Sequence, residues 1–179
     1  MTEDFTEQVI DSTVAFQGRL LTVRVDTVQL PIGGTSTREV VVHPGAVAII
    51  PLLEDTVIFV RQWRNAAGQA LLEIPAGTLA SGEDPRDCAT RELMEEIGYR
   101  PGKLTGLCSF FLAPGYSTEK LHVFLAEELT PEKRPQDEDE VLEIVALTWE
   151  EIDACLQRGE FADAKTIAGL LLAAKRLRG

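Results

Sequence analysis

Hydrophobic and polar residues alternate in short runs along most of this chain, which is the pattern of β-strands that bury one face. Turn residues separate the runs, and the predicted strands lie at residues 14–16, 20–30, 39–42, 46–53, 57–62, 71–74, 104–111, 121–126 and 142–147. The runs 46–53 and 57–62 flank Glu54 and Asp55, which predicts a buried hairpin. A sheet therefore makes up most of the predicted core.

Helical spacing of apolar residues predicts helices at residues 85–97, 149–158 and 163–177. The first of these has clear ends. Asp84 can cap it, Pro85 suits its first position, and Gly98 is a natural stop after its last turn.

Apolar stripes on these helices indicate which face meets the sheet. In the first helix the stripe consists of Ala89, Leu93 and Ile97. In the last helix the residues spaced as one face are Ala168, Leu171, Leu172 and Lys175, and basic residues follow at the C-terminal end. Strands interleaved with helices, without a repeat or a dividing linker, predict an α/β fold with a mixed sheet and helices on its faces.

Composition narrows the class of protein. The 179 residues are 45% hydrophobic and 26% charged, which suffices for one sizeable globular core. The net charge of −12 argues against a nucleic-acid partner, because nonspecific binding of nucleic acid needs a basic patch. An anionic substrate must then be received by local cations or metals.

Targeting signals and cysteines agree with a cytoplasmic protein. The first residues are acidic and lack the apolar segment of a signal peptide, and no apolar stretch approaches the roughly 18 residues of a membrane span. The cysteines, Cys88, Cys108 and Cys155, are odd in number and form no Cys-x-x-Cys pair, as expected of reduced intracellular thiols. We therefore expect a cytoplasmic protein without a membrane partner.

Carboxylates gather in one short segment that spans a loop and the first predicted helix: Glu83, Glu92, Glu95 and Glu96, with Arg91 beside them. Helical spacing turns Glu92, Glu95 and Glu96 to roughly one side. Such a cluster repels itself unless hard divalent cations sit among the oxygens, and Mg²⁺ takes carboxylate and water ligands before it binds substrate phosphates. A solvated acidic helix face is the alternative, but it leaves the lead-in at residues 74–77 and the excess of acid unexplained. The segment predicts a metal site for phosphate chemistry.

Residues 77–99 resemble the Nudix box, Gly-x5-Glu-x7-Arg-Glu-U-x-Glu-Glu-x-Gly-U, where U is a bulky aliphatic residue. The matching positions are Gly77, Glu83, Arg91, Glu92, Leu93, Glu95, Glu96 and Gly98, and the final U is Tyr99, which keeps an apolar ring. This resemblance implies a Nudix-type α/β/α sandwich and an enzyme that hydrolyses a nucleoside diphosphate linked to another moiety. It also implies that the glutamates of the box hold divalent metals.

Further stretches over nearly the whole chain resemble the ADP-ribose pyrophosphatase branch of the Nudix hydrolases, and they lie at residues 38–39, 43–48, 60–64, 72–77, 110–117, 137–140 and 163–166. Pro114 and Gly115 stand where a proline is typical of that branch. The resemblance implies Mg²⁺-dependent hydrolysis of ADP-ribose, a small nucleotide substrate, to AMP and ribose 5-phosphate. Two alternatives stay open: a hydrolase of another nucleotide sugar, such as GDP-mannose, or of a dinucleotide, and a non-catalytic nucleotide-binding module. Such modules generally lose box glutamates, and this chain keeps them.

The same resemblance implies roles for residues of the metal site. The ligands of Mg²⁺, for which Mn²⁺ can substitute, would be Glu92, Glu95, Glu96 and the backbone carbonyl of Ala76, with Glu83 in support. Arg91 would orient the glutamates. The catalytic base is left open between Glu95 and a glutamate of the acidic run 137–140, Glu138 or Glu140, which a mobile loop would bring over the metals. A solvated loop is the alternative for this run.

Residues that contact the substrate are implied in the same way. Arg64 is favoured over Arg61 as a clamp on phosphate or ribose, because a guanidinium offers a planar fork to phosphate oxygens. The alternative for this arginine is a surface salt bridge.

The nucleoside end of the substrate would be bound by a second set: Arg38, Glu39, Glu73, Pro114 and Gly115. Glu39 and Glu73 would accept hydrogen bonds from the adenine amino group or from ribose hydroxyls, or else be edge-strand charges in solvent. Some relatives have an arginine at the position of Thr37. This chain departs from their pattern there, so the resemblance supports a substrate contact of Arg38 less strongly than the other contacts.

Residues 1–42 precede the catalytic region, 43–179, as a β extension. Their strand patterns carry apolar residues that need a cover, namely Val14, Phe16, Leu21, Val23 and Val25. The resemblance implies that this extension packs across a two-fold axis and completes the adenosine pocket of a partner subunit. A homodimer is therefore expected.

Overall fold

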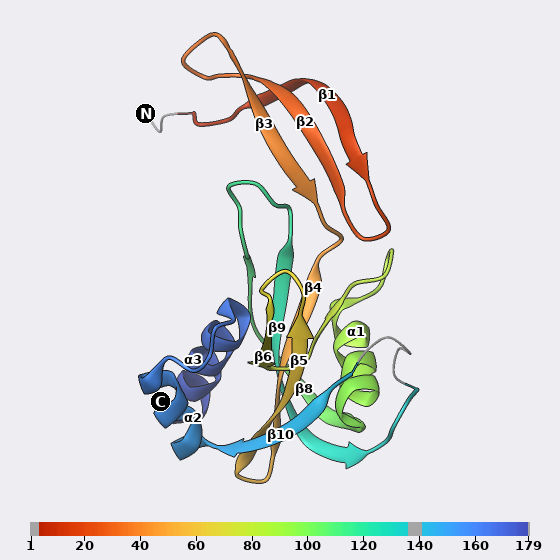
Figure 1. The fold of residues 1–179 in the computed structure, drawn as a ribbon, viewed down its shortest axis with the longest axis vertical. Coiled ribbons are helices and arrows are strands. Elements are labelled where there is room, and N and C mark those ends of the chain that lie inside the picture. The colour runs from red at the N-terminus through yellow and green to blue at the C-terminus, as the bar shows by residue number, and fades with distance from the viewer. Residues whose placement is uncertain (1–3, 136–140, 179) are drawn as a thin grey trace. The chain divides into compact units, whose positions relative to one another are not determined.

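The computed structural model describes residues 4–135 and 141–178, which divide into two compact units (Figure 1). One unit consists of Met1–Gly45 and Phe111–Lys120, and the other of Ala46–Phe110 and Leu121–Gly179. A segment far along the chain therefore folds with the N-terminal strands.

The smaller unit contains a three-stranded antiparallel sheet in the order β1-β2-β3. Its strands are β1 (Gln8–Gln17), β2 (Thr22–Gln29) and β3 (Thr35–Val42). The predicted strands of this region are confirmed, but β1 begins at Gln8 instead of Val14. Residues 8–13 are mostly polar, and it is pairing with β2 along the whole strand that keeps them extended.

The segment 111–120 is attached to β3 by main-chain hydrogen bonds. The N–H of Val41 donates to the carbonyl of Tyr116 (2.7 Å), and the N–H of Thr118 donates to the carbonyl of Val41 (3.0 Å). The hydroxyl of Thr118 also accepts from the N–H of His43 (2.9 Å). The N-terminal sheet and this segment therefore form one hydrogen-bonded piece.

The larger unit is built on a mixed sheet in the order β10-β5-β4-β9-β8, with β6 paired to β5 and β7 paired to β4. Its strands are β4 (Ala46–Leu53), β5 (Thr56–Arg64), β6 (Gln69–Glu73), β7 (Ala76–Thr78), β8 (Tyr99–Phe111), β9 (Lys120–Pro131) and β10 (Glu143–Thr148). The hairpin predicted between β4 and β5 is confirmed, and Glu54 takes left-handed turn geometry (φ 53°). The central strand β4 runs parallel to β9 and antiparallel to β7.

Strands β4 and β5 pair only next to their turn, at Leu52 with Val57 and at Leu53 with Thr56. Beyond that point β4 takes β7 and β9 as neighbours, while β5 takes β6 and β10. The short strand β7 was not predicted, because its sequence Ala-Gly-Thr carries no apolar alternation. Its position beside β4 brings Gly77 to the central strand of the sheet.

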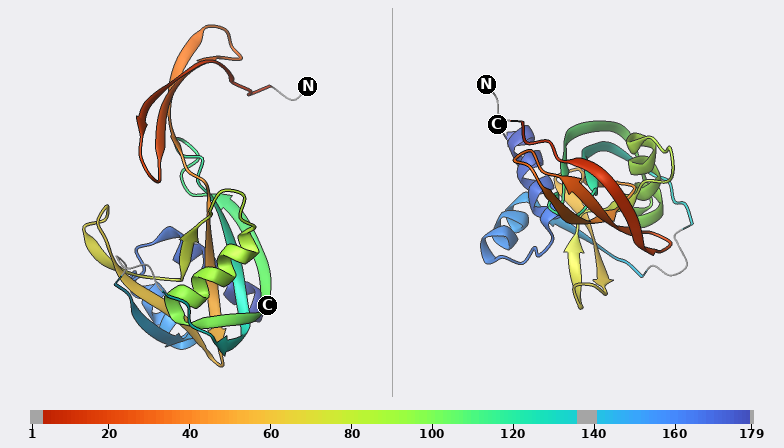
Figure 2. Two further views of the ribbon diagram at one scale, coloured as in Figure 1. Left: turned by 90° about the vertical axis from the view of Figure 1, so that its right-hand side faces the viewer. Right: turned by 90° about the horizontal axis from the view of Figure 1, so that it is seen from above.

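Helices cover both faces of this sheet (Figure 1). On one face lies α1 (Pro85–Glu92), which continues as the π-helix η1 (Leu93–Ile97), and on the other lie α2 (Trp149–Arg158) and α3 (Ala164–Arg178) (Figure 2). The predicted α/β/α sandwich is confirmed. Within the described residues, no helix is both long and apolar enough to cross a membrane.

The ends and the inner face of the first helix agree with the prediction. The Asp84 side chain accepts a hydrogen bond from the N–H of Arg86 (2.8 Å), and Gly98 closes η1 in left-handed geometry (φ 74°). The predicted stripe of Ala89, Leu93 and Ile97 is buried in a core shared with β4 and β5. Burial of this stripe sets the orientation of the helix and therefore the side on which its glutamates lie.

The packing face of α3 differs from the prediction. The helix buries Gly169, Leu170 and Ala173, whereas Leu171 of the predicted face is 56% exposed. A Cβ atom at Gly169 would lie 2.9 Å from the Cδ1 atom of Ile74, so the helix approaches the sheet where its side chains are smallest. A pattern of large apolar residues does not reveal such a contact, and the predicted face was therefore wrong.

This difference can be tested with two adjacent leucines. Leu170→Ala should lower the free energy of unfolding by about 2–5 kcal/mol, because it removes a side chain that is 1% exposed. Leu171→Ala is the matched control and should change it by less than about 0.5 kcal/mol. Urea unfolding followed by circular dichroism measures both, and equal losses would contradict the observed face.

Candidate active site

The carboxylate cluster is carried by a helix that changes type in its middle. The N–H of Gly98 donates to the carbonyl of Leu93, five residues back, so the last turn is a π-turn. Glu95 and Glu96 both lie in this turn, and Glu92 immediately precedes it. Single π-turns inside helices occur frequently at functional sites.

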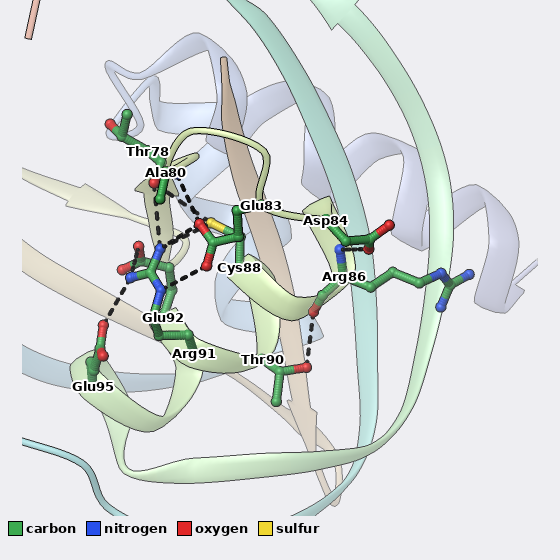
Figure 3. A network of polar contacts seen from close by, with 10 residues as sticks. All are labelled: Thr78, Ala80, Glu83, Asp84, Arg86, Cys88, Thr90, Arg91, Glu92 and Glu95. Carbon is green, nitrogen blue, oxygen red and sulfur yellow. Dashed lines mark hydrogen bonds and ion pairs between the residues drawn. The ribbon is translucent and has the colours of Figure 1, made fainter. Parts of the chain in front are cut away.

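Arg91 lies at the centre of the cluster and contacts three glutamates (Figure 3). Its Nε and Nη2 donate to the two oxygens of Glu83 (2.9 and 3.1 Å), and its Nη1 donates to Glu92 (2.6 Å) and to Glu95 (3.0 Å). Hydrogen bonds from Arg91 lower the pKa of Glu83 to about 2, and those to Glu83 are the main reason that the pKa of Arg91 is raised. The pair therefore stays ionised at neutral pH.

Glu83 and Arg91 also make contacts outside the carboxylate cluster, with the loop before the helix and with a cysteine of the helix. Glu83 also accepts from the N–H of Ala80 (2.9 Å), and Arg91 reaches the sulfur of Cys88 (3.3 Å). Burial raises the pKa of the Cys88 thiol to about 12, so this cysteine is a neutral packing group and not a nucleophile.

Strand β7 approaches the cluster closely from the sheet side. The carboxylate of Glu96, which is 6% exposed, accepts from the N–H of Ala76 (3.3 Å). A Cβ atom at Gly77 would lie 1.9 Å from the carboxyl carbon of Glu92. Only glycine leaves room for Glu92 in this arrangement, which explains why the segment begins with that residue.

A polar cavity of about 360 Å³ opens beside these groups. Its lining residues are Arg64, Ala76, Gly77, Thr78, Arg91, Glu92 and Glu95. Guanidinium donors and carboxylate acceptors thus meet in one cavity of the larger unit, which suits an anionic ligand that arrives with cations.

The structure distinguishes between the two arginines of β5. Arg64 lines the cavity, whereas Arg61 forms an exposed ion pair with Glu143 (3.0 Å) on β10. Arg64 is held by Glu73, whose oxygens accept from its Nε (2.9 Å) and Nη2 (2.7 Å). The carboxylate of Glu73 is buried, so it is not an edge charge in solvent. Direct bonding of Glu73 to a substrate stays a prediction.

The donor set fits a hard divalent cation in its chemistry. Glu92, Glu95 and Glu96 offer carboxylate oxygens next to the Ala76 backbone, and these are ligands that Mg²⁺ prefers. Among the described residues, however, no three acidic, histidine or cysteine side chains already form a metal-binding group. Arg91 takes oxygens of Glu92 and Glu95, so a cation would compete with Arg91 for them.

Comparison with known families now places the chain. The sequence model of the NUDIX domain matches residues 42–170, and that of the nucleoside diphosphate sugar hydrolase N-terminal domain matches residues 7–41. The chain belongs to the Nudix family.

Known proteins similar to this chain match it over most of their own length. The chain is 43% identical to an ADP-ribose pyrophosphatase of Bacillus subtilis (strain 168), covering 89% of this chain and 88% of the relative. It is 40% identical to a methanol dehydrogenase activator of Bacillus methanolicus, covering 91% and 90%. A crystal structure of an ADP compounds hydrolase superposes with a TM-score of 0.87 at 27% identity, covering 97% of this chain and 95% of the other.

The remaining predicted residues of this Nudix protein lie elsewhere. Arg38, Glu39, Pro114 and Gly115 belong to the smaller unit, where Arg38 is bonded to Glu7 and the other three are exposed. The predicted bases Glu138 and Glu140 lie outside the described residues. The roles given to these residues stay predictions.

Two charged residues behind the Nudix cavity were not predicted as part of the site. Lys165 is 9% exposed and donates to both Glu73 and Asp163. One signal was present in the sequence, because a lysine in the first turn of a helix opposes the helix dipole and needs acidic partners.

The Arg91–Glu83 pair predicts a pH dependence of stability. Since the pKa of Glu83 falls from 4.5 to about 2 on folding, its contribution is complete above pH 4.5 and is lost as the pH falls towards 2. Urea midpoints measured between pH 5 and pH 2 should fall more steeply in the wild type than in Glu83→Gln. Parallel curves would show that this pair contributes nothing to stability.

Proposed function

We propose that this protein hydrolyses the pyrophosphate of ADP-ribose to AMP and ribose 5-phosphate, with Mg²⁺ as cofactor. The observation that carries the proposal is the complete set of box glutamates, three of which Arg91 contacts, beside a cavity that Arg64 lines. The relative from Bacillus subtilis that is named an ADP-ribose pyrophosphatase supports the choice of substrate.

In this proposal the metal ligands are Glu92, Glu95, Glu96 and the Ala76 carbonyl, with Glu83 in support. When bound, Mg²⁺, or Mn²⁺ in its place, would supply polarisation of the phosphates and activation of water. Arg91 keeps the glutamates oriented towards the cavity.

The chain's own residues then position the substrate. Arg64 presents N–H groups to a phosphate or ribose at the cavity wall. Arg38, Glu39, Glu73, Pro114 and Gly115 are assigned to the nucleoside end. The catalytic base is Glu95, Glu138 or Glu140.

A substrate panel tests the proposal. Release of nucleoside monophosphate with Mg²⁺ is measured for ADP-ribose, GDP-mannose, NADH and a diadenosine polyphosphate, and ADP-ribose should have the highest kcat/KM. A higher kcat/KM for another compound would assign the chain to a Nudix branch with a different substrate. No turnover at all would favour a regulatory module, the class to which the relative named methanol dehydrogenase activator points.

The metal ligands predict large losses of turnover. Glu92→Gln and Glu96→Gln should each lower kcat on the order of a hundredfold. Gly77→Ala should have a similar effect because its methyl group would displace Glu92, whereas Gly106→Ala, where the nearest atom is 3.8 Å away, is the control. Near-normal kcat in both glutamine variants at saturating Mg²⁺ would rule out these ligands.

The identity of the base is tested by the glutamates of the acidic run. If Glu138 or Glu140 takes the proton, its replacement by Gln should lower kcat with little change in KM. Full activity in both single variants and in the double variant would leave Glu95 as the base.

The N-terminal β extension is proposed to form a homodimer. Val9, Val14 and Phe16 of β1 are each more than half exposed, so the strand presents apolar side chains that a second copy could cover. Deleting residues 1–38 should abolish both dimerisation and ADP-ribose binding. A fully active species of 19.6 kDa by light scattering of the intact chain would overturn this proposal.

A further inference from the structure

From Arg64 at the cavity, four charged side chains form a continuous series in the larger unit, and its two middle members are the least exposed. The series begins with Arg64, whose side chain is 39% exposed, and passes through Glu73 and Lys165 to Asp163. Arg64 donates twice to Glu73, Lys165 donates to the same oxygen of Glu73 as the Nη2 of Arg64, and Lys165 also donates to Asp163 (2.9 Å). Cations and carboxylates alternate, so the charges compensate along the series.

The position of Lys165 is electrostatically unfavourable without these partners. It lies in the first turn of α3, where the helix dipole is positive, and it is 9% exposed. Burial alone would raise the pKa of Glu73 and of Asp163, but hydrogen bonds and the nearby cations lower both overall. The two carboxylates therefore remain charged and hold the lysine between them.

Other contacts besides this lysine attach α3 to the sheet. The hydroxyl of Thr166 accepts from the N–H of Ile74 (3.0 Å) and donates to Asp163 (2.6 Å), which ties the helix start to the end of β6. Gly169, Leu170 and Ala173 pack the following turns. Lys165 is an additional contact between α3 and the sheet. It bonds Glu73, which in turn bonds Arg64 at the cavity.

Glu73 fixes one edge of the Arg64 guanidinium. The bonds from Nε and Nη2 occupy that edge, and among the described residues none accepts a hydrogen bond from Nη1. Arg64 also lines the cavity with Ala76, Gly77 and Glu92. A bidentate pair of this kind sets the plane of the guanidinium, and it leaves donors for a ligand oxygen.

We propose that Lys165 and Asp163 are positioning residues, which hold Glu73 so that Arg64 presents its remaining N–H groups to a substrate phosphate in the cavity. The inference rests on the proposed function, since it takes Arg64 as the phosphate clamp. Lys165 and Asp163 touch no substrate atom and act only through Glu73.

A double-mutant cycle tests this assignment. KM and kcat are measured for the preferred substrate of the panel in the wild type, Lys165→Met, Arg64→Ala and the double variant. Lys165→Met should raise KM about tenfold when Arg64 is present, with little change in kcat, and by less than about twofold in the Arg64→Ala background. Thermal unfolding of the same proteins measures the loss of stability separately from the change in KM.

Matched controls come from the same elements. Lys175→Met alters an exposed lysine of α3, and Arg61→Ala alters the exposed arginine of β5, and neither should change KM. If Lys165→Met does not fold, Asp163→Asn breaks the series one step further back and should show the same dependence on Arg64. Equal effects of the lysine or aspartate variant with and without Arg64 would overturn the inference.

The inference and the proposed function can fail separately. If no compound of the panel is hydrolysed, the same cycle is measured on the dissociation constant of ADP-ribose by calorimetry. If the effects of the Lys165 and Arg64 variants on binding are coupled but no compound is hydrolysed, the proposed reaction is wrong and the positioning role is retained. If the substrate is hydrolysed but the two effects are additive, the proposed reaction is retained and the positioning role is wrong. A wild type that binds no ADP-ribose would overturn both the reaction and the positioning role.

Discussion

The guanidinium of Arg91 allows three carboxyl groups to approach one another, and two of them lie at the wall of a cavity. Two like charges 4 Å apart repel by about 4 kcal/mol at the effective dielectric constant near a protein surface. Arg91 offsets this repulsion by donating to Glu83, Glu92 and Glu95 at 2.6–3.1 Å. Glu83 also accepts a hydrogen bond from the N–H of Ala80, so Arg91 holds the loop before the helix through Glu83. The acidic cluster, the loop and the cavity wall therefore depend on one side chain.

Close backbone approach is the second condition of the site. Strand β7 pairs with the central strand β4, and there its missing side chain at Gly77 makes room for Glu92. Gly169 plays a comparable role on the other face, where it lets α3 approach Ile74. In both places a glycine is needed for contact between elements and not for a turn, since neither has a positive φ. A helix side chain or a helix can thus approach the sheet closely at each of these glycines.

Features of local origin could be predicted from the sequence. The hairpin at Glu54, the Asp84 cap and the stop at Gly98 follow from a few neighbouring residues, and the box glutamates follow from their spacing. Three features could not be predicted in this way. Strand β7 is too short to show a pattern, the α3 face is chosen by small residues, and Lys165 meets Glu73 across 92 positions of sequence. Long-range pairing of buried charges has no local pattern, and only the unfavourable lysine at a helix start hints at it.

The π-turn at Leu93–Ile97 sets a limit on how this segment can vary. A π-turn holds one residue more than the α-turn that it replaces, so the spacing between Glu92 and Gly98 is matched to a bulge. If the same residues formed a regular α-helix, each step along the chain would turn by about 100°, more than in the wider π-turn, and Glu96 would point in a different direction relative to Glu92. The carboxylate that now accepts from the N–H of Ala76 would then turn away from it. Side chains in this segment can therefore be exchanged only as long as the π-turn is kept, because this turn sets the direction of Glu96.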